Sequence, residues 1–220
     1  RLARDLTAAG RQDVSRVPAW LLWYRGLAAA HVFKHDEAIA DMRELVHRAE
    51  DEEDPARLTY MPLEPNTYRS VLAAMLRAAG RMDEAAATYT EVLEHDAGAY
   101  MAHIALADIA EARGDLLAAL EQRQAAAAAN PDDFTTDVEV GITLARLGRL
   151  VEAEETLKRV AAVQPRSPRP WYVLGLIQQQ TKQAINGLPG LTQLPVLGSL
   201  FRSRDYVNGQ TELVVLVTPY

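Results

Sequence analysis

The pattern of apolar and polar positions divides the chain into two parts of different character. Residues 1–183 read as alanine-rich helix. From residue 184 onward Pro and Gly recur every few positions, and no charged residue occurs until Arg202. The run 213–217 is then continuously apolar and rich in β-branched residues, which predicts a strand. The pattern therefore predicts a helical body followed by a short piece of loop and β structure.

Internal repeats account for the helical part. The phrases HDEAIADM, RMDEAAATY, GDLLAALEQ and RLVEAEETL align on a shared alanine, at Ala38, Ala85, Ala119 and Ala153. The spacings between these alanines are 47, 34 and 34 residues. A 34-residue period with helix–turn–helix character is that of tetratricopeptide repeats (TPR). The longer first spacing implies a 13-residue insertion, which the stretch 50–66 fills, and its acidic run is expected to be a solvated loop.

Glycine and proline positions support the same register. Gly80, Gly114 and Gly148 each stand five residues before the shared alanine, where they can end the first helix of a pair. Pro131 and Pro165 fall at the end of a repeat and prevent the second helix from continuing. We expect close helix packing at three further glycines, Gly26, Gly141 and Gly175. With Trp171 and Leu174 beside Gly175, residues 19–183 resemble a TPR array of four repeats plus the first helix of a fifth, which would end near Gln180.

The resemblance implies a mainly α fold, an α-solenoid of antiparallel helix pairs, with residues 1–18 as a partial helix or lead-in. Such an array lines a concave groove with its first helices. The groove positions implied here are Trp20, Trp23, Arg77, Ile104, Asp108, Glu111, Val138, Ile142, Arg146 and Tyr172. The Lys and Asn that clamp a chaperone's terminal carboxylate in some TPR proteins are absent from the matching positions. The mixture favours an amphipathic or extended apolar peptide, although Trp20 and Trp23 could equally be core residues.

The last 37 residues carry a second resemblance. They contain four short motifs in order: Pro-Gly-Leu, Leu-Pro-Val-Leu-Gly, Leu-Phe and a closing Glu-Leu-Val…Thr-Pro. The motif residues used below are Pro189, Gly190, Leu194, Pro195, Val196, Leu197, Gly198, Phe201, Glu212, Thr218 and Pro219. This arrangement resembles the C-terminal end of secretins, the ring-forming outer-membrane channels, and is most similar to those of Tad (Flp) pili. We therefore expect a secretin-like segment over 184–220, with a wall strand that needs a partner strand.

The junction between the two resemblances raises a further hypothesis. A fifth repeat needs a second helix with its alanine near position 187, and the sequence there is TKQAINGLPG. The repeat is thus cut in half. We expect that Gln183 and Ala184 are not natural neighbours, or that residues between them are missing.

Candidate chemistry is sparse. The formal net charge of −7 argues against a nucleic-acid binder, and the chain has no cysteine. His31 and His35 stand four apart but lack the neighbouring Glu of a catalytic zinc motif. No Gly-rich phosphate loop or Gly-x-Ser-x-Gly elbow occurs. The uncharged run 184–201 contains too many Pro and Gly for a spanning helix. We expect no catalysis, no cofactor and no metal site.

The sequence favours a non-catalytic interaction scaffold associated with a secretin, in pilus assembly or protein secretion at the bacterial outer membrane. Its partners would be a peptide in the groove and secretin or pilus-assembly subunits, and membrane association would come only through a secretin or an anchor upstream of Arg1. Two alternatives stay open: a general TPR adaptor, cytoplasmic or periplasmic, with an incidental tail, and the regulatory part of an enzyme whose catalytic domain lies elsewhere.

Overall fold

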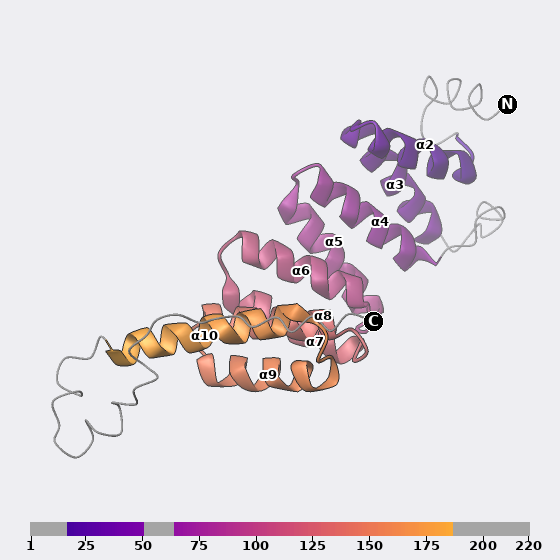
Figure 1. The fold of residues 1–220 in the computed structure, drawn as a ribbon. Helices are drawn as coiled ribbons and strands as arrows, with labels where there is room; N and C mark the ends of the chain where they lie inside the picture. Colours follow the sequence, from indigo (N-terminus) through magenta and orange to yellow (C-terminus); the bar gives the residue numbers. More distant parts are fainter. Residues whose placement is uncertain (1–16, 51–63, 187–220) are drawn as a thin grey trace, which may run out of the picture. The chain divides into compact units, whose positions relative to one another are not determined.

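The computed structural model describes residues 17–50 and 64–186, and within these ranges the chain forms helices and no strand. The helices are α2 (Ala19–His31), α3 (His35–Glu50), α4 (Pro65–Ala78), α5 (Met82–His95), α6 (Tyr100–Ala112), α7 (Leu116–Ala129), α8 (Phe134–Arg146), α9 (Leu150–Val163) and α10 (Pro168–Asn186) (Figure 1). The lead-in up to residue 16, the insertion loop and the secretin-like motif lie outside the described residues. The chain divides into two compact units, of which the first ends at Val173 and the second begins at Leu174.

Helices α2 to α9 pack as a series of antiparallel pairs. Extensive contacts join only helices that follow one another along the chain, as in a solenoid. The shared alanine of each repeat lies in the second helix of its pair. Ala38, Ala85, Ala119 and Ala153 are all fully buried. The predicted α-solenoid and its repeat register are therefore confirmed for these four pairs.

Two of the three glycines expected at close helix crossings are found there. A Cβ built on Gly26 would lie 2.5 Å from Met42 Cε, and one built on Gly141 would lie 2.7 Å from Leu157 Cγ. Both contacts involve the second helix of the same pair. At Gly141 a Cβ would require Leu157 to shift, whereas at Gly26 the end of the flexible Met42 side chain could move away and Asp41 Cβ, at 3.2 Å, is the firmer neighbour. For Gly175, a Cβ would meet none of the described atoms within 4 Å, so the expected close crossing is not found in the described part of the chain. Among the described residues, no second helix follows α10 to pack against it.

The turns inside the pairs share one backbone motif. Gly80, Gly114 and Gly148 have φ values of 76°, 80° and 76°, in the left-handed region that glycine tolerates. At each turn the N–H of the next residue bonds to the carbonyl five residues back, as from Arg81 to Leu76 at 2.9 Å, which makes a Schellman motif. The first repeat makes the same turn, with Lys34 N–H bonded to the Ala29 carbonyl at 2.9 Å. There the left-handed residue is Phe33, with a φ of 60°.

We expect Phe33→Gly to stabilise the protein by about 0.5–1 kcal/mol. A non-glycine residue in the left-handed region costs about 1–2 kcal/mol, part of which the greater unfolded-state entropy of glycine offsets. Little burial is lost, because Phe33 is one of the most exposed side chains described. Urea denaturation measures the free energy of unfolding, and Gly114→Ala is the matched control, with an expected loss of about 1 kcal/mol. A destabilised Phe33→Gly variant would show that the edge contact of Phe33 with His35 matters more than the backbone.

Helix α10 differs from the earlier first helices in length and in surface. It runs to Asn186, past the end expected near Gln180 and through the expected boundary at residues 183–184. Near its start, Trp171 Nε1 donates a hydrogen bond to the Pro165 carbonyl at 3.2 Å. Trp171, Tyr172 and Leu176 are all exposed. α10 thus presents apolar side chains that a completed fifth repeat would partly cover.

Candidate functional site

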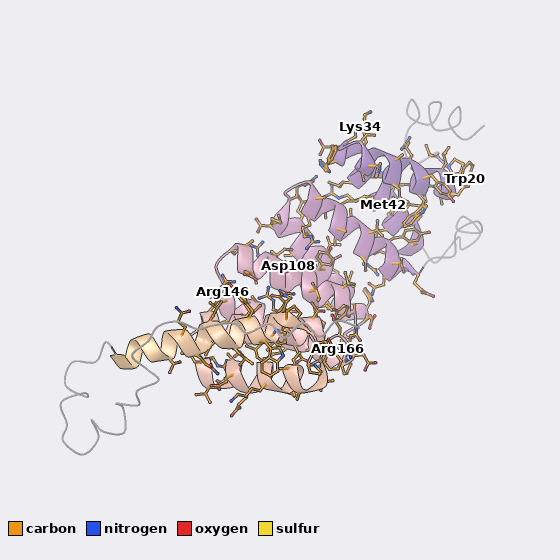
Figure 2. All side chains as sticks on the ribbon, viewed as in Figure 1. Trp20, Lys34, Met42, Asp108, Arg146 and Arg166 are labelled. Carbon is orange, nitrogen blue, oxygen red and sulfur yellow. The ribbon has the colours of Figure 1, made fainter. Side chains whose placement is uncertain are left out.

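The predicted groove residues lie on the first helices of the pairs, as the register requires. Trp20 and Trp23 lie on α2, Arg77 on α4, Ile104, Asp108 and Glu111 on α6, Val138, Ile142 and Arg146 on α8, and Tyr172 on α10. Figure 2 labels Trp20, Asp108 and Arg146 among them. Whether they bind a ligand together is a proposal that depends on the surfaces around them.

Two of these positions contribute to the core. Val138 is 3% exposed, so its side chain packs inside the array, and its predicted contact with a ligand stays a prediction. Trp23 is half-buried, and its ring meets the fully buried Tyr68 edge-on, with centroids 5.7 Å apart and planes at 77°. Trp23 therefore supports the α2–α4 contact on at least one side of its ring.

Two adjoining cavities flank α6, and we call them together the α6 groove. The first, of about 410 Å³, lies toward α4, and the second, of about 340 Å³, lies toward α8. Tyr100, Ile104 and Asp108 line both. The first is also lined by Ser70, Ala74, Arg77, Tyr89, Ala99, Met101, Ala102 and Ala105, and the second by Ala107, Arg123, Asp133, Thr135, Thr136 and Glu139. The structure thus places three predicted residues, Arg77, Ile104 and Asp108, at one surface.

An ion pair spans the first cavity. Arg77 Nη1 on α4 lies 3.1 Å from Asp108 Oδ2 on α6, and both side chains are about half exposed. An ion pair so accessible to water contributes at most about 1 kcal/mol. It can therefore open at little cost when a ligand approaches.

Glu111 takes part in a different, more buried network. It accepts hydrogen bonds from Arg123 Nη2 on α7 and from Arg146 Nη1 on α8, and Arg123 also donates to Thr143 Oγ1. The hydrogen bond from Arg123, and then that from Arg146, hold the pKa of Glu111 below its ordinary value, although burial opposes them. Because both carboxylate oxygens are engaged, Glu111 and Arg146 join α6, α7 and α8 together and offer little to a ligand.

Asp133 carries a charge that no described cation pairs with. Oδ2 accepts from Tyr100 Oη and, at 3.0 Å, from Thr136 Oγ1, while Oδ1 accepts from the Thr135 N–H at 3.1 Å as the cap of α8. The hydrogen bond from Tyr100 is the largest cause that lowers the pKa of Asp133. Burial, and then that same hydrogen bond, raise the pKa of Tyr100. The arrangement holds an ionised carboxylate at the edge of the second cavity.

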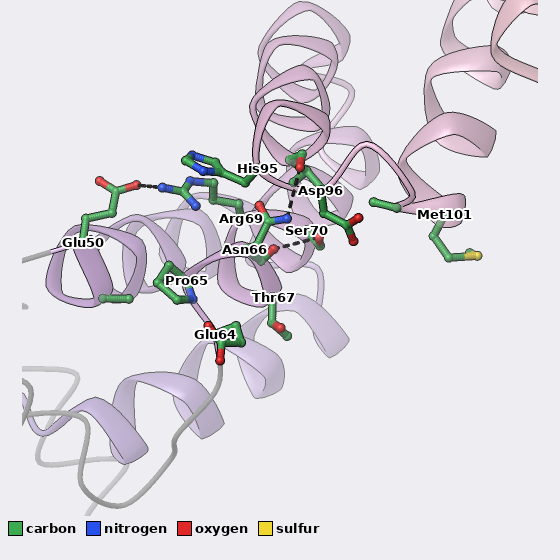
Figure 3. A pocket seen from close by; sticks show the side chains of 13 residues that line it. Glu50, Glu64, Pro65, Asn66, Thr67, Arg69, Ser70, His95, Asp96 and Met101 are labelled. Atoms are coloured by element: carbon green, nitrogen blue, oxygen red, sulfur yellow. Dashed lines mark hydrogen bonds and ion pairs between the residues drawn. The ribbon is translucent and has the colours of Figure 1, made fainter. Parts of the chain in front are cut away.

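A larger cavity, which the sequence did not indicate, lies where α3 ends and α4 begins. It measures about 830 Å³ and is lined by residues including Glu64, Asn66, Arg69, His95 and Met101 (Figure 3). Arg69 Nη2 pairs with Glu50 at 2.6 Å, and Asn66 Nδ2 donates to the Val92 carbonyl at 3.1 Å. Within the described part of the chain, the buried Oδ1 of Asn66 has no partner. The cavity adjoins Glu50 and Glu64, between which lie residues 51–63, outside the described ranges.

Comparisons with known proteins agree with this geometry. The tetratricopeptide repeat model matches residues 72–134. The array is similar in structure to the protein MamA, with a TM-score of 0.59 at 15% identity over 74% of this chain and 81% of that one. It is also similar to YrrB, described as "a TPR protein with an unusual peptide-binding site", with a TM-score of 0.57 at 17% identity over 78% of this chain and 80% of that one.

Residues 72–134 are thus tetratricopeptide-repeat-like in sequence, and the helix pairs as a whole have the fold of tetratricopeptide repeat arrays. TPR arrays are protein-interaction modules, so the general role of this chain is that of a protein–protein interaction scaffold. Such modules are typically non-catalytic. No described helix has the length and apolarity that a membrane span requires.

The C-terminal part matches a second family. The model of the bacterial type II and III secretion system protein, the secretin, matches residues 170–220, which are therefore secretin-like. The uncharacterised protein y4xJ of Sinorhizobium fredii is 37% identical over 73 residues, 33% of this chain, and Secretin XpsD of Xanthomonas campestris pv. campestris is 42% identical over 45 residues, 20% of this chain. These matches span only 17% and 6% of the two relatives.

Proposed function

We propose that this chain is a non-catalytic TPR scaffold that binds a peptide segment of another protein in the α6 groove and associates with a secretin. Its setting would be the bacterial cell envelope, in protein secretion or pilus assembly at the outer membrane. The observation that carries the proposal is the presence, in one chain, of a TPR array and of a secretin-like segment.

The α6 groove supports the peptide-binding part of the proposal. Ile104 and several alanines give the groove an apolar lining, to which Arg77, Asp108, Asp133 and Glu139 add charged side chains. Extended peptides bind such surfaces through apolar side chains in pockets and polar contacts at the rim. Met101, 69% exposed at the edge of the first cavity, is an accessible apolar contact for a ligand.

The overlap at α10 supports a physical link between the two parts. The secretin match begins at residue 170, two residues after α10 starts and 14 before the boundary expected from the repeat pattern. Helix α10 then continues without interruption to Asn186. The domain boundary stays a prediction, and we infer that it falls before Trp171, so that most of α10 belongs with the secretin-like segment.

Binding to overlapping 15-residue peptides that cover the sequence of Secretin XpsD tests the function. We expect the full 220-residue chain to bind a subset of these peptides above scrambled versions of the same composition. Met101→Glu should weaken this binding at least about tenfold, because it places a charge at the edge of the apolar cavity.

Val151→Glu is the matched control, because Val151 is an equally exposed apolar residue on α9, away from the α6 groove. Fluorescence anisotropy gives the dissociation constants. Equal weakening by both substitutions would place binding outside the α6 groove. Failure of every secretin peptide, together with binding of unrelated peptides, would favour the general TPR adaptor.

A further inference from the structure

The second cavity of the α6 groove has more negative than positive charge at its surface. Asp108, Asp133 and Glu139 line it, and Arg123 is its one cationic lining residue. The Arg123 side chain is only 8% exposed and already bonds to Glu111 and Thr143. Its charge is therefore committed within the protein and is not available to a ligand.

Asp133 is the carboxylate best prepared for a cationic partner. Its three donors, Tyr100 Oη, Thr136 Oγ1 and the Thr135 N–H, are all neutral, so they fix its position without cancelling its charge. Asp108 and Glu139 have cationic partners, Arg77 and Arg169. A cationic group of a ligand could thus pair with Asp133 without breaking an existing ion pair.

The rest of the groove indicates what carries that cation. Ile104 and Ala107 form an apolar wall of the second cavity, which suits the long apolar stem of an arginine or lysine. The adjoining first cavity has Ala74, Ile104 and Ala105, which suit an aliphatic side chain. In an extended peptide, side chains two positions apart point to the same side, about 7 Å apart. The groove therefore fits an apolar residue followed two positions later by a basic one.

The secretin-like sequence contains that pattern. In the stretch LGSLFRSRDY, residues 197–206, Leu200 is followed at two-residue steps by Arg202 and Arg204, the two cationic residues of 184–220. We propose that the α6 groove binds this Leu-x-Arg-x-Arg segment when a separate secretin-like molecule presents it, with the leucine in the first cavity and an arginine beside Asp133. This inference rests on the proposed function and specifies its ligand.

The test uses a fluorescein-labelled synthetic peptide of residues 197–206. The full chain carries Arg202→Gln and Arg204→Gln, so that its own copy of the segment does not compete. We expect the peptide to bind, and binding to weaken about tenfold when both peptide arginines are replaced with glutamine. Asp133→Asn in the protein should weaken it by a similar factor, since asparagine keeps the helix cap but removes the charge.

Asp132→Asn is the matched control, because this exposed neighbour lines neither cavity and makes the same change in net charge. We expect it to leave the affinity unchanged. Equal affinities for Asp133→Asn and Asp132→Asn, or for the arginine and glutamine peptides, would overturn the inference. If Met101→Glu still abolished binding of secretin peptides in that case, the proposed function would stand without this ligand. Absence of binding by every peptide would instead refute both.

Discussion

Replacement of Tyr68 with alanine should lower the free energy of unfolding by about 3–5 kcal/mol, the range for loss of a large aromatic side chain from a core. Tyr68 on α4 is fully buried, and its ring meets Trp23 of α2 edge-on at 5.7 Å. The substitution therefore removes the packing of this α4 side chain in the core. It also removes the aromatic contact that joins the first two helix pairs. Urea denaturation of the full chain, followed by tryptophan fluorescence, measures the loss.

Tyr68→Phe is the control for this prediction, since it keeps the ring and removes only the hydroxyl group. We expect it to cost well under half of the alanine value. A double-mutant cycle with Trp23→Leu then isolates the ring–ring contact, with an expected coupling of about 0.5–1.5 kcal/mol. Absence of coupling would mean that Trp23 does not stabilise this contact and is available to a ligand, as the repeat pattern alone had allowed.

The repeat architecture could be predicted from the sequence because its determinants are local. A small residue is required wherever two helices cross closely, and a left-handed residue wherever a Schellman turn ends a helix. Both requirements recur every 34 residues, so alanines and glycines such as Ala119 and Gly114 repeat at that spacing in the sequence. Phe33 shows the limit of this rule. The first repeat forms the same turn, with the same hydrogen bond from Lys34 to Ala29, but with a non-glycine residue at the left-handed position.

The character of the groove could not be predicted to the same degree. The register places Val138 and Ile142 on the same helix, but burial of Val138 depends on the volumes of side chains from neighbouring helices. Likewise, Glu111 looks like a free groove carboxylate until Arg123, from the next helix, reaches it. Asp133 lies outside the first-helix pattern. Only its three hydrogen-bond donors, which the structure shows, identify it as a candidate binding residue. Contacts between side chains of different helices decide these points, and periodicity carries no information on them.

The segment from Trp171 to Gly175 shows how a correct local pattern can be shared by two families. Trp, Leu and Gly at TPR spacing predicted a fifth repeat, and a helix does form there. A Cβ on Gly175 would nevertheless meet no atom of the described residues within 4 Å, and the secretin match covers the same segment. A short apolar run with one glycine fits the sequence pattern of both families. Only the segment that packs against this helix would distinguish a TPR helix from a secretin helix.

Glu111→Ala should lower the free energy of unfolding by about 3 kcal/mol, because it leaves the guanidinium of Arg123 buried without its carboxylate. Stability should also change with pH. The pKa of Glu111 is lowered in the folded protein, so its contribution is fully present well above its ordinary value of 4.5 and is lost as the pH falls through the folded value. In Glu111→Gln, which cannot titrate, the free energy of unfolding should therefore fall less steeply below about pH 4.5.

Two controls separate the buried ion pair from the exposed one. Arg146→Ala removes the more exposed partner of Glu111 and should cost at most about 1 kcal/mol. The double substitution Glu111→Leu with Arg123→Met removes both buried charges and should recover most of the stability lost in Glu111→Ala, since apolar residues of similar volume can replace a buried pair at little cost. A double variant less stable than Glu111→Ala would show that Arg123 stabilises the array mainly through Thr143.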